Sequence, residues 1–207
     1  FKTDYSNAAR TQLFDIHSLC WNEAICKLFG INESMLPEVC DSNSFFGETD
    51  FGGLLETPIP IYGVLGDSNG ALFGQGCTQP GMVKSTYGTG SSVMMNIGDK
   101  PVLSENGLVT SLAWSMNGKV QYVLEGNINY TGAVTKWVVE DLQLLRSSKE
   151  AGDVAISANP EDNTYLVPAF TGLGAPHWNS EAKAMICGMT RGTGRAALVK
   201  AAEECIA

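Results

Sequence analysis

The strongest constraint on the fold is a pair of β-type runs on either side of a glycine-rich turn. The runs cover residues 83–86 and 92–97, and Tyr87-Gly88-Thr89-Gly90-Ser91 lies between them. This arrangement predicts a β-hairpin with the glycines at its tip. Glycine there permits a positive φ and lets backbone N–H groups approach an anion, while the Thr89 hydroxyl adds a donor. The turn therefore suits a phosphate, although a hairpin turn without a ligand is the commoner use of such a sequence.

One carboxylate, Asp67, follows a further β-type run. Its residues Ile59, Ile61, Val64 and Leu65 are apolar and mostly β-branched, with Pro58 and Pro60 at the start and Gly66 at the end, which predicts a short buried strand. Residues 69–77 have a helical composition, so Asp67 is expected near a helix N-terminus, where the macrodipole favours the ionised form. An ionised Asp can accept a proton. A plain helix N-cap is the alternative, and it is the more frequent use of Asp at such a position.

Several motifs follow one another in order along the chain. They are Gly66-Asp67, Ala71-Leu72-Phe73-Gly74-Gln75, Pro80-Gly81-Met82, Thr86-Tyr87-Gly88-Thr89-Gly90, Leu124-Glu125-Gly126 and Val167-Pro168-Ala169-Phe170-Thr171-Gly172-Leu173-Gly174-Ala175-Pro176. Together they resemble the FGGY carbohydrate kinases, and the glycerol kinases among them most closely. The match runs from residues 3–11 to residues 188–192, which is nearly the whole chain.

The resemblance implies an α/β protein with part of the actin-like ATPase fold, which has a ribonuclease-H-like core in each half. It also implies ATP-dependent phosphorylation of a polyol or sugar hydroxyl, with ATP and Mg²⁺ as cofactors. By this match Asp67 is the catalytic base, Thr89 lies at the transferred phosphate between Gly88 and Gly90, and Gly132 lines the nucleotide site. No metal ligand is predicted within the chain itself, because the ion is held mainly by phosphates, waters and carboxylates outside it.

Some positions depart from the glycerol kinase pattern. Ser68 stands where those kinases have Gln, Ser92 where they have Phe, and Lys136 where they have a nucleotide-contacting Gln. The two serines predict a roomier, differently polar substrate site that accepts a substrate larger than glycerol, such as a pentulose. Gly52-Gly53-Leu54 and Pro58 replace the loop that serves fructose-bisphosphate inhibition in some glycerol kinases, and we expect that regulation to be absent.

The resemblance also indicates how the chain is organised. We place the end of an N-terminal FGGY domain at residues 1–75 and part of the C-terminal domain at residues 76–207. The chain opens on Phe1, stops within a helical pattern and lacks the family's Asp-Gly-Thr loop, Arg-Glu substrate pair and Gly-Gly adenosine motif. We therefore expect an internal piece of a longer kinase that is inactive alone. Its final helix, short of partners for Leu198, Ala202 and Ile206, is expected to promote association, for example as a homo-oligomer.

The remaining segments alternate between helical and β-type patterns. Helices are predicted at 21–29, 129–145 and 194–207, a hairpin at 108–114 and 120–124 around Asn117-Gly118, strands at 165–170 and 184–189, and irregular segments at 36–60 and 146–163. In the first helix, Ala24, Ile25, Leu28 and Phe29 share one apolar face.

Composition narrows the partners and the compartment. With 13 basic and 22 acidic residues the net charge is −9, and no basic stripe is interleaved with aromatics, so neither nucleic acid nor an anionic membrane is an expected partner. The partner that the resemblance implies is a small polyol or sugar. The six cysteines show no C-x-x-C spacing, no apolar run approaches the roughly 20 residues of a membrane span, and no signal peptide opens the chain. These features predict a cytoplasmic protein with reduced thiols.

Two other functions stay open at this point. One is a non-catalytic, actin-like nucleotide-binding protein whose closure signals to a partner, although Asp67 at a substrate-facing position argues against it. The other is an inactive fragment that serves as an interaction or folding unit, which the absent motifs favour.

Overall fold

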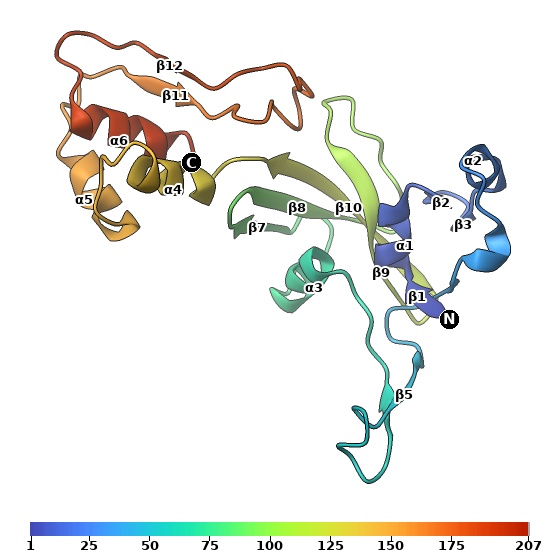
Figure 1. Cartoon of the computed structure of the whole chain (residues 1–207). Helices are drawn as coiled ribbons and strands as arrows, with labels where there is room; N and C mark the ends of the chain where they lie inside the picture. Colours follow the sequence, from blue (N-terminus) through green and yellow to red (C-terminus); the bar gives the residue numbers. More distant parts are fainter. Residues whose placement is uncertain (207) are drawn as a thin grey trace. The chain divides into compact units, whose positions relative to one another are not determined.

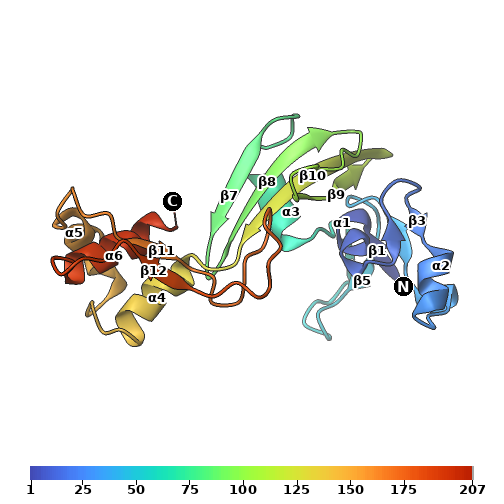
Figure 2. The same cartoon turned by 90° about the horizontal axis from the view of Figure 1, so that it is seen from above.

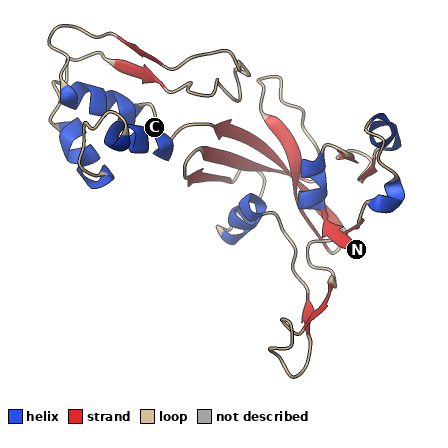
Figure 3. Cartoon of the chain, viewed as in Figure 1, coloured by secondary structure: helices blue, strands red, loops and turns tan. Residues whose placement is uncertain are grey.

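A computed structural model describes residues 1–206, so Ala207, the last residue of the helix predicted at 194–207, lies outside the described part. The chain mixes helices and strands (Figures 1 and 3) and divides into two compact units. Unit 1 comprises Phe1–Lys84 and Met94–Glu125, and unit 2 comprises Ser85–Val93 and Gly126–Ala207. Among residues 1–206, none of the helices combines the length and the apolar character of a membrane span.

Unit 1 begins with short paired strands and a short helix that has a side-chain cap. Strand β1 (Lys2–Asp4) pairs in parallel with β4 (Glu38–Cys40), and β2 (Phe14–Asp15) pairs with β3 (Cys20–Trp21) in an antiparallel ladder. Helix α1 (Tyr5–Ala8) starts at Asp4, whose side chain accepts bonds from the backbone N–H groups of Ser6 and Asn7. The 3₁₀ turn η1 (Ala9–Thr11) continues from α1. A capping Asp therefore sets the direction of the first helix.

One sheet has four strands (Figure 2), in the order β7 (Val83–Tyr87), β8 (Ser91–Gly98), β10 (Lys119–Ile128) and β9 (Val109–Met116). Strands β7 and β8 flank residues 88–90, as the sequence predicts. The second predicted hairpin is also confirmed, because β9 and β10 pair antiparallel and their turn has positive φ at both Asn117 (53°) and Gly118 (73°).

Successive side chains of β9 and β10 pack into two separate cores. Leu112 and Tyr122 join the core that contains Ala8 of α1, whereas Ala113 and Val123 join the core of Leu72 in helix α3 (Asp67–Gly74). Neighbouring residues of a strand point to opposite faces, so α1 and α3 cover different faces of the sheet.

The buried strand predicted before Asp67 is wrong. Only Ile59–Ile61 forms a strand, β6, which pairs with β5 (Gly47–Thr49) in an isolated two-stranded ribbon. Ile59 and Ile61 keep 46% and 38% of their surface exposed, and residues 62–66 are irregular. Pro58 and Pro60 supply no backbone N–H, which suits an edge and not the interior of a sheet. The helix predicted at 69–77 exists but begins earlier, at Asp67 itself.

The first predicted helix is shorter than expected and buries a different residue. Helix α2 spans Glu23–Leu28 and is capped by Asn22, which accepts the Ile25 N–H at 3.0 Å. The apolar face of Leu28 and Phe29 is exposed, and the residue that packs inward is Cys26. The segment predicted to be irregular, 36–60, also contains β4, β5 and part of β6, after the 3₁₀ turn η2 (Glu33–Met35).

Unit 2 has a helical core of its own. Its elements are α4 (Gly132–Glu140), η3 (Ser148–Glu150), α5 (Ala151–Ile156), β11 (Tyr165–Val167), β12 (Met185–Cys187) and α6 (Arg195–Glu204). The two strands pair antiparallel within the ranges predicted for them. Helix α4 ends at Glu140 instead of 145, and α5 lies in the segment predicted to be irregular. The core is formed mainly by Val134 and Val138 of α4 and by Val199, Ala201 and Ala202 of α6.

Helix α6 is better packed than the sequence indicates. Ala202 is buried in the core of unit 2, and Ile206 packs against that core. The expectation that this face is short of packing partners is therefore wrong for Ala202, whereas Leu198 and Ile206 are half-buried. A homo-oligomer stays a prediction.

Candidate active site

Asp67 occupies the first turn of α3. The residue at the N-cap is Gly66, which makes no side-chain capping bond, so Asp67 is not the N-cap that the sequence left as an alternative. The exposed Asp67 carboxylate accepts a bond from the Ser68 N–H through Oδ1, at 2.6 Å. This local bond orients the carboxylate at a helix N-terminus, where negative charge is stabilised.

A buried hydrogen-bond chain fixes the backbone just before Asp67. Asp4 is fully buried and accepts the hydroxyls of Ser6 at 2.7 Å and Ser42 at 2.8 Å. The same Ser6 oxygen accepts the Gly66 N–H at 2.9 Å. Because charge-assisted bonds to a buried carboxylate are strong, Asp4 holds Ser6, and Ser6 holds Gly66.

Asn69 anchors the other side of Asp67 to the sheet. Its buried amide donates to the carbonyls of Leu112 at 3.0 Å and Ala113 at 2.9 Å on β9. Both flanks of Asp67 and Ser68 are therefore tied to different parts of unit 1, and the two side chains have a well-defined position.

Asp67 and Ser68 line one pocket of about 460 Å³ in unit 1. Its charged lining residues are Arg10, Asp67 and Glu125, and its other members are Ser6, Asn7, Leu65, Gly66, Ser68 and Asn69. Arg10 Nη2 and Glu125 Oε2 form an ion pair at 2.5 Å. The volume is in the range of small-molecule sites, and its lining is mainly polar.

A buried lysine lies near this pocket. Lys84 on β7 is only 1% exposed. Burial lowers the pKa of Lys84, and the carboxylates of Glu125 and Asp67 oppose that shift, whereas the Arg10 guanidinium adds to it. Two cations and two carboxylates therefore interact in this part of unit 1.

The sequence assigned no role to Arg10, Lys84 or Glu125. Glu125 belongs to the Leu-Glu-Gly motif, and Lys84 is a charge inside a β-type run, which is the one local signal that marks it. Arg10 and Glu125 are 115 positions apart, so their contact has no local signature.

The turn at residues 88–90 in unit 2 has a different reason for its glycines than the one predicted. Neither Gly88 nor Gly90 has a positive φ. A Cβ at Gly90 would lie 2.7 Å from the Ile128 carbonyl oxygen, and a Cβ at Gly132 would lie 2.5 Å from that of Gly88. Glycine is required because the backbone of the turn lies close to the end of β10 at Gly90 and to the start of α4 at Gly88.

The carbonyls of this turn cap helix α4. Thr131 and Ala133 donate their N–H groups to Thr89 O at 3.0 and 3.1 Å, and Gly132 donates to Gly88 O at 2.9 Å. The Thr131 hydroxyl also donates to Gly88 O, at 3.0 Å. The first amides of α4 are therefore already occupied, and this helix end is not free to bind an anion.

Lys136 lies one turn after Gly132 on α4. Its ammonium is 3.6 Å from Glu140 in an exposed pair of the i,i+4 type. Lys136 also lines a pocket of about 340 Å³ with Trp137 and Phe170, whose ring centroids are 4.9 Å apart. Ser92 is half-buried on β8 in the same unit.

The structure thus brings the predicted residues together in two sets. Asp67 and Ser68 share the pocket of unit 1. Gly88, Thr89 and Gly90 contact the start of α4 at Gly132 in unit 2, and Lys136 follows on that helix.

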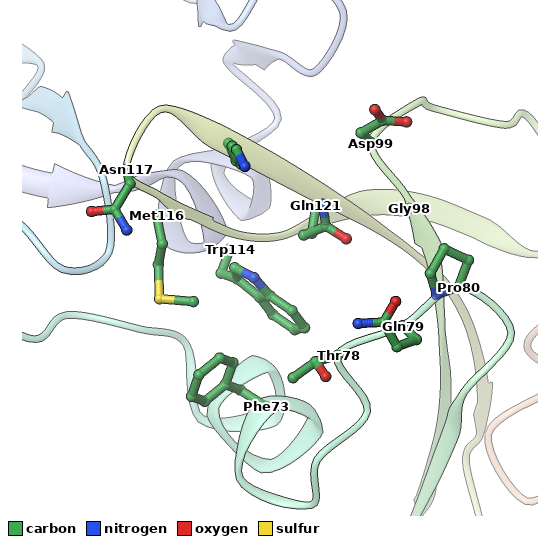
Figure 4. Close-up of a pocket in the computed structure, with 11 residues that line it drawn as sticks. Phe73, Thr78, Gln79, Pro80, Gly98, Asp99, Trp114, Met116, Asn117 and Gln121 are labelled. Atoms are coloured by element: carbon green, nitrogen blue, oxygen red, sulfur yellow. The ribbon is translucent and has the colours of Figure 1, made fainter.

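A larger pocket in unit 1 contains none of the predicted site residues. It has a volume of about 560 Å³ (Figure 4), and Phe73 and Trp114 form its aromatic wall with ring centroids 5.3 Å apart. Gln79, Gln121 and Asp99 add polar groups.

Comparison with known proteins identifies the family. Residues 1–74 match the N-terminal domain, and residues 83–207 the C-terminal domain, of the FGGY family of carbohydrate kinases. Two similar curated proteins are the glycerol kinase of Chromobacterium violaceum, 51% identical over 205 residues, and that of Francisella tularensis subsp. holarctica, 50% identical over 205 residues. Each alignment covers 99% of this chain and 41% of the relative, so the chain spans about two fifths of their length.

Solved structures agree with this assignment. The glycerol kinase of Plasmodium falciparum, solved with ADP, matches with a TM-score of 0.87 and 40% identity over 99% of this chain and 41% of that protein. A xylulose kinase from Lactobacillus acidophilus, at 20% identity, has the same fold with a TM-score of 0.84 over 99% of this chain and 42% of that protein. The chain therefore belongs to the FGGY family of carbohydrate kinases, and its two units are part of the actin-like ATPase fold of that family.

Proposed function

We propose that the protein with this sequence transfers the γ-phosphoryl group of ATP to a hydroxyl of a polyol or sugar. The observation that carries the proposal is the position of Asp67, an exposed carboxylate in a polar pocket whose flanking residues are tied down by Ser6 and Asn69. The similarity to glycerol kinases, one of them solved with ADP, supports the same reaction class.

In this mechanism Asp67 is the general base. Asp67 takes the proton of the acceptor hydroxyl as that oxygen forms a bond to the γ-phosphorus, and the bond from this phosphorus to the bridging oxygen breaks to release ADP. Thr89, with the backbone of Gly88 and Gly90, is proposed to steady the transferred group, and Gly132 and Lys136 to contact the nucleotide. The protein has little covalent work to do, so positioning and charge stabilisation supply the rate.

Mg²⁺ is the proposed metal. Within residues 1–206 no group of three or more His, Cys, Asp or Glu side chains is placed to hold a metal ion. Magnesium in kinases needs no such cage, because it binds through substrate phosphates and waters with one or two carboxylates. We propose that the nucleotide carries the ion and that the ion neutralises charge on the phosphates.

A cytoplasmic location is proposed as well. All six cysteines are unpaired, which supports a reducing compartment.

The acceptor is proposed to be larger than glycerol. Ser68 lines the Asp67 pocket and presents a hydroxyl in place of the larger Gln of glycerol kinases, and Ser92 makes a similar change elsewhere on the chain. A site with extra hydrogen-bonding groups favours a substrate that satisfies them. A polyol or ketose with four or five carbons meets that requirement.

Substitution of Asp67 tests the role of the base. The assay uses the protein at the length its organism makes, which we call the native-length protein, with ATP and a panel of polyols and sugars. Asp67→Asn is expected to lower kcat at least ~100-fold with a modest change in KM, since it removes the base and keeps the size of the side chain.

Asp153→Asn is the matched control. Asp153 is also an exposed Asp in the first turn of a helix, α5, but it lies outside the candidate pockets, so its kcat should equal that of the parent protein. Near-normal turnover of Asp67→Asn would contradict the assignment and would favour a non-catalytic nucleotide-binding protein.

A further inference from the structure

The Asp67 pocket contains one cationic lining residue, Arg10. Its other charged members are the carboxylates Asp67 and Glu125. The product of the proposed reaction is a phosphate ester formed at the hydroxyl beside Asp67, so the pocket has to accept a dianionic group close to a carboxylate. Such a group needs a positive partner.

Arg10 is held by Glu125 and stays partly accessible. The ion pair joins Nη2 to Glu125 Oε2 at 2.5 Å, and the side chains are 43% and 5% exposed. Glu125 is thus the buried anchor and Arg10 the accessible partner. A guanidinium has five N–H donors in a rigid plane, so an Arg that is fixed at one edge can still bind a phosphate oxygen with another.

The charge of the surrounding groups favours an anion at this position. Glu125 interacts with two cations, Arg10 and the buried Lys84, so these three groups carry a net charge of +1. Asp67 balances that charge while it is ionised. When Asp67 takes the hydroxyl proton its own charge is lost, and the positive charge of the three groups then acts on the phosphoryl group.

We propose that Arg10, anchored by Glu125, binds the phosphoryl group on the acceptor side of the pocket and so recognises the phosphorylated product. This inference rests on the proposed kinase function and adds a residue to it. Arg10 is the binding residue, and Glu125 is a positioning residue that acts through Arg10. The same contact stabilises the charge that develops on the phosphoryl oxygens during transfer.

The test compares two ligands that differ only by the phosphate. Binding of glycerol and of glycerol 3-phosphate to the native-length protein is measured by calorimetry, together with the best acceptor found in an activity screen and its phosphate ester. Arg10→Met should lower the affinity for the phosphate ester at least ~10-fold, because a charge-assisted bond to phosphate is lost. The affinity for the unphosphorylated acceptor should change less than ~2-fold.

Two further variants separate binding from folding. Arg10→Gln keeps a donor for Glu125 but has no charge, so it should show the same selective loss if Arg10→Met fails to fold. Arg191→Met removes an exposed Arg of a unit 2 loop and should leave both affinities unchanged.

The outcomes are distinct. If the parent protein is an active kinase, two results would overturn the proposal. One is an equal loss of affinity for the ester and for the acceptor in Arg10→Met, and the other is an unchanged affinity for the ester in Arg10→Gln. A parent protein that phosphorylates no polyol or sugar and binds no ester would overturn the proposed function and this inference with it.

Discussion

Gly132→Ala is expected to damage unit 2 although it adds a single methyl group. The new Cβ would lie 2.5 Å from Gly88 O and 3.3 Å from Gly88 C, and both are backbone atoms that no side-chain rotation can move away. Reaching an ordinary contact of 3.4 Å requires a shift of about 0.9 Å (3.4 − 2.5) at the turn.

That shift also breaks hydrogen bonds. Gly88 O accepts the Gly132 N–H at 2.9 Å and the Thr131 hydroxyl at 3.0 Å. Overpacking costs about 1–3 kcal/mol and each lost bond about 0.5–1.5 kcal/mol, whereas replacing a helical Gly by Ala returns about 0.5–1 kcal/mol. The net loss of unfolding free energy should be about 1–5 kcal/mol.

Urea unfolding followed by far-UV circular dichroism measures this loss. Gly152→Ala is the matched control, because Gly152 is also in the first turn of a helix, α5, and a Cβ there meets nothing within 4 Å. The control should be unchanged or stabilised by up to about 1 kcal/mol. Equal stability of Gly132→Ala and Gly152→Ala would refute the argument that the turn and α4 are in backbone contact. If residues 88–90 hold phosphate as proposed, Gly132→Ala should also weaken ATP binding by the native-length protein, whereas Gly152→Ala should not.

Further predictions concern the substrate, the anchor of α3 and the thiols. A screen of the native-length protein should give a higher kcat/KM for a four- or five-carbon polyol or ketose than for glycerol, and glycerol as the best substrate would show that Ser68 and Ser92 do not widen the site. Asn69→Ala should lower the unfolding free energy by about 1–3 kcal/mol, because it removes two buried bonds to β9, and should lower kcat as well; unchanged stability would mean that these bonds do not hold α3. Burial raises the pKa of Cys205 to about 11, so at pH 8 iodoacetamide should modify the exposed Cys20 well before Cys205, and equal rates would contradict the burial of Cys205.

The elements that could be predicted are those with a local cause. The Asn117-Gly118 turn needs two residues that tolerate a positive φ, and the run around Gly88 to Gly90 has β-type residues on both sides, so both hairpins could be identified from short stretches of sequence. Helix α5 could not be predicted in this way, because its sequence has no regular pattern of apolar residues and Ala151 is the one buried residue of the helix. Packing against α6 is therefore the main reason that α5 forms. The run at 59–65 has a β-type pattern, but only Ile59–Ile61 pairs, in a two-stranded ribbon with β5, and its prolines suit an edge.

For the candidate site, the sequence alone predicted Asp67, the turn at residues 88–90 and, through the family resemblance, the kind of reaction. These are short motifs, which can be recognised in the sequence before the structure is known. The tertiary structure decided what surrounds them: the chain from Asp4 through Ser6 to Gly66, the pair of Arg10 with Glu125, and the backbone contact that requires glycine at position 132. These contacts join residues separated by tens of positions, and they depend on burial and on distances between charges, which arise only when the strands and helices pack together.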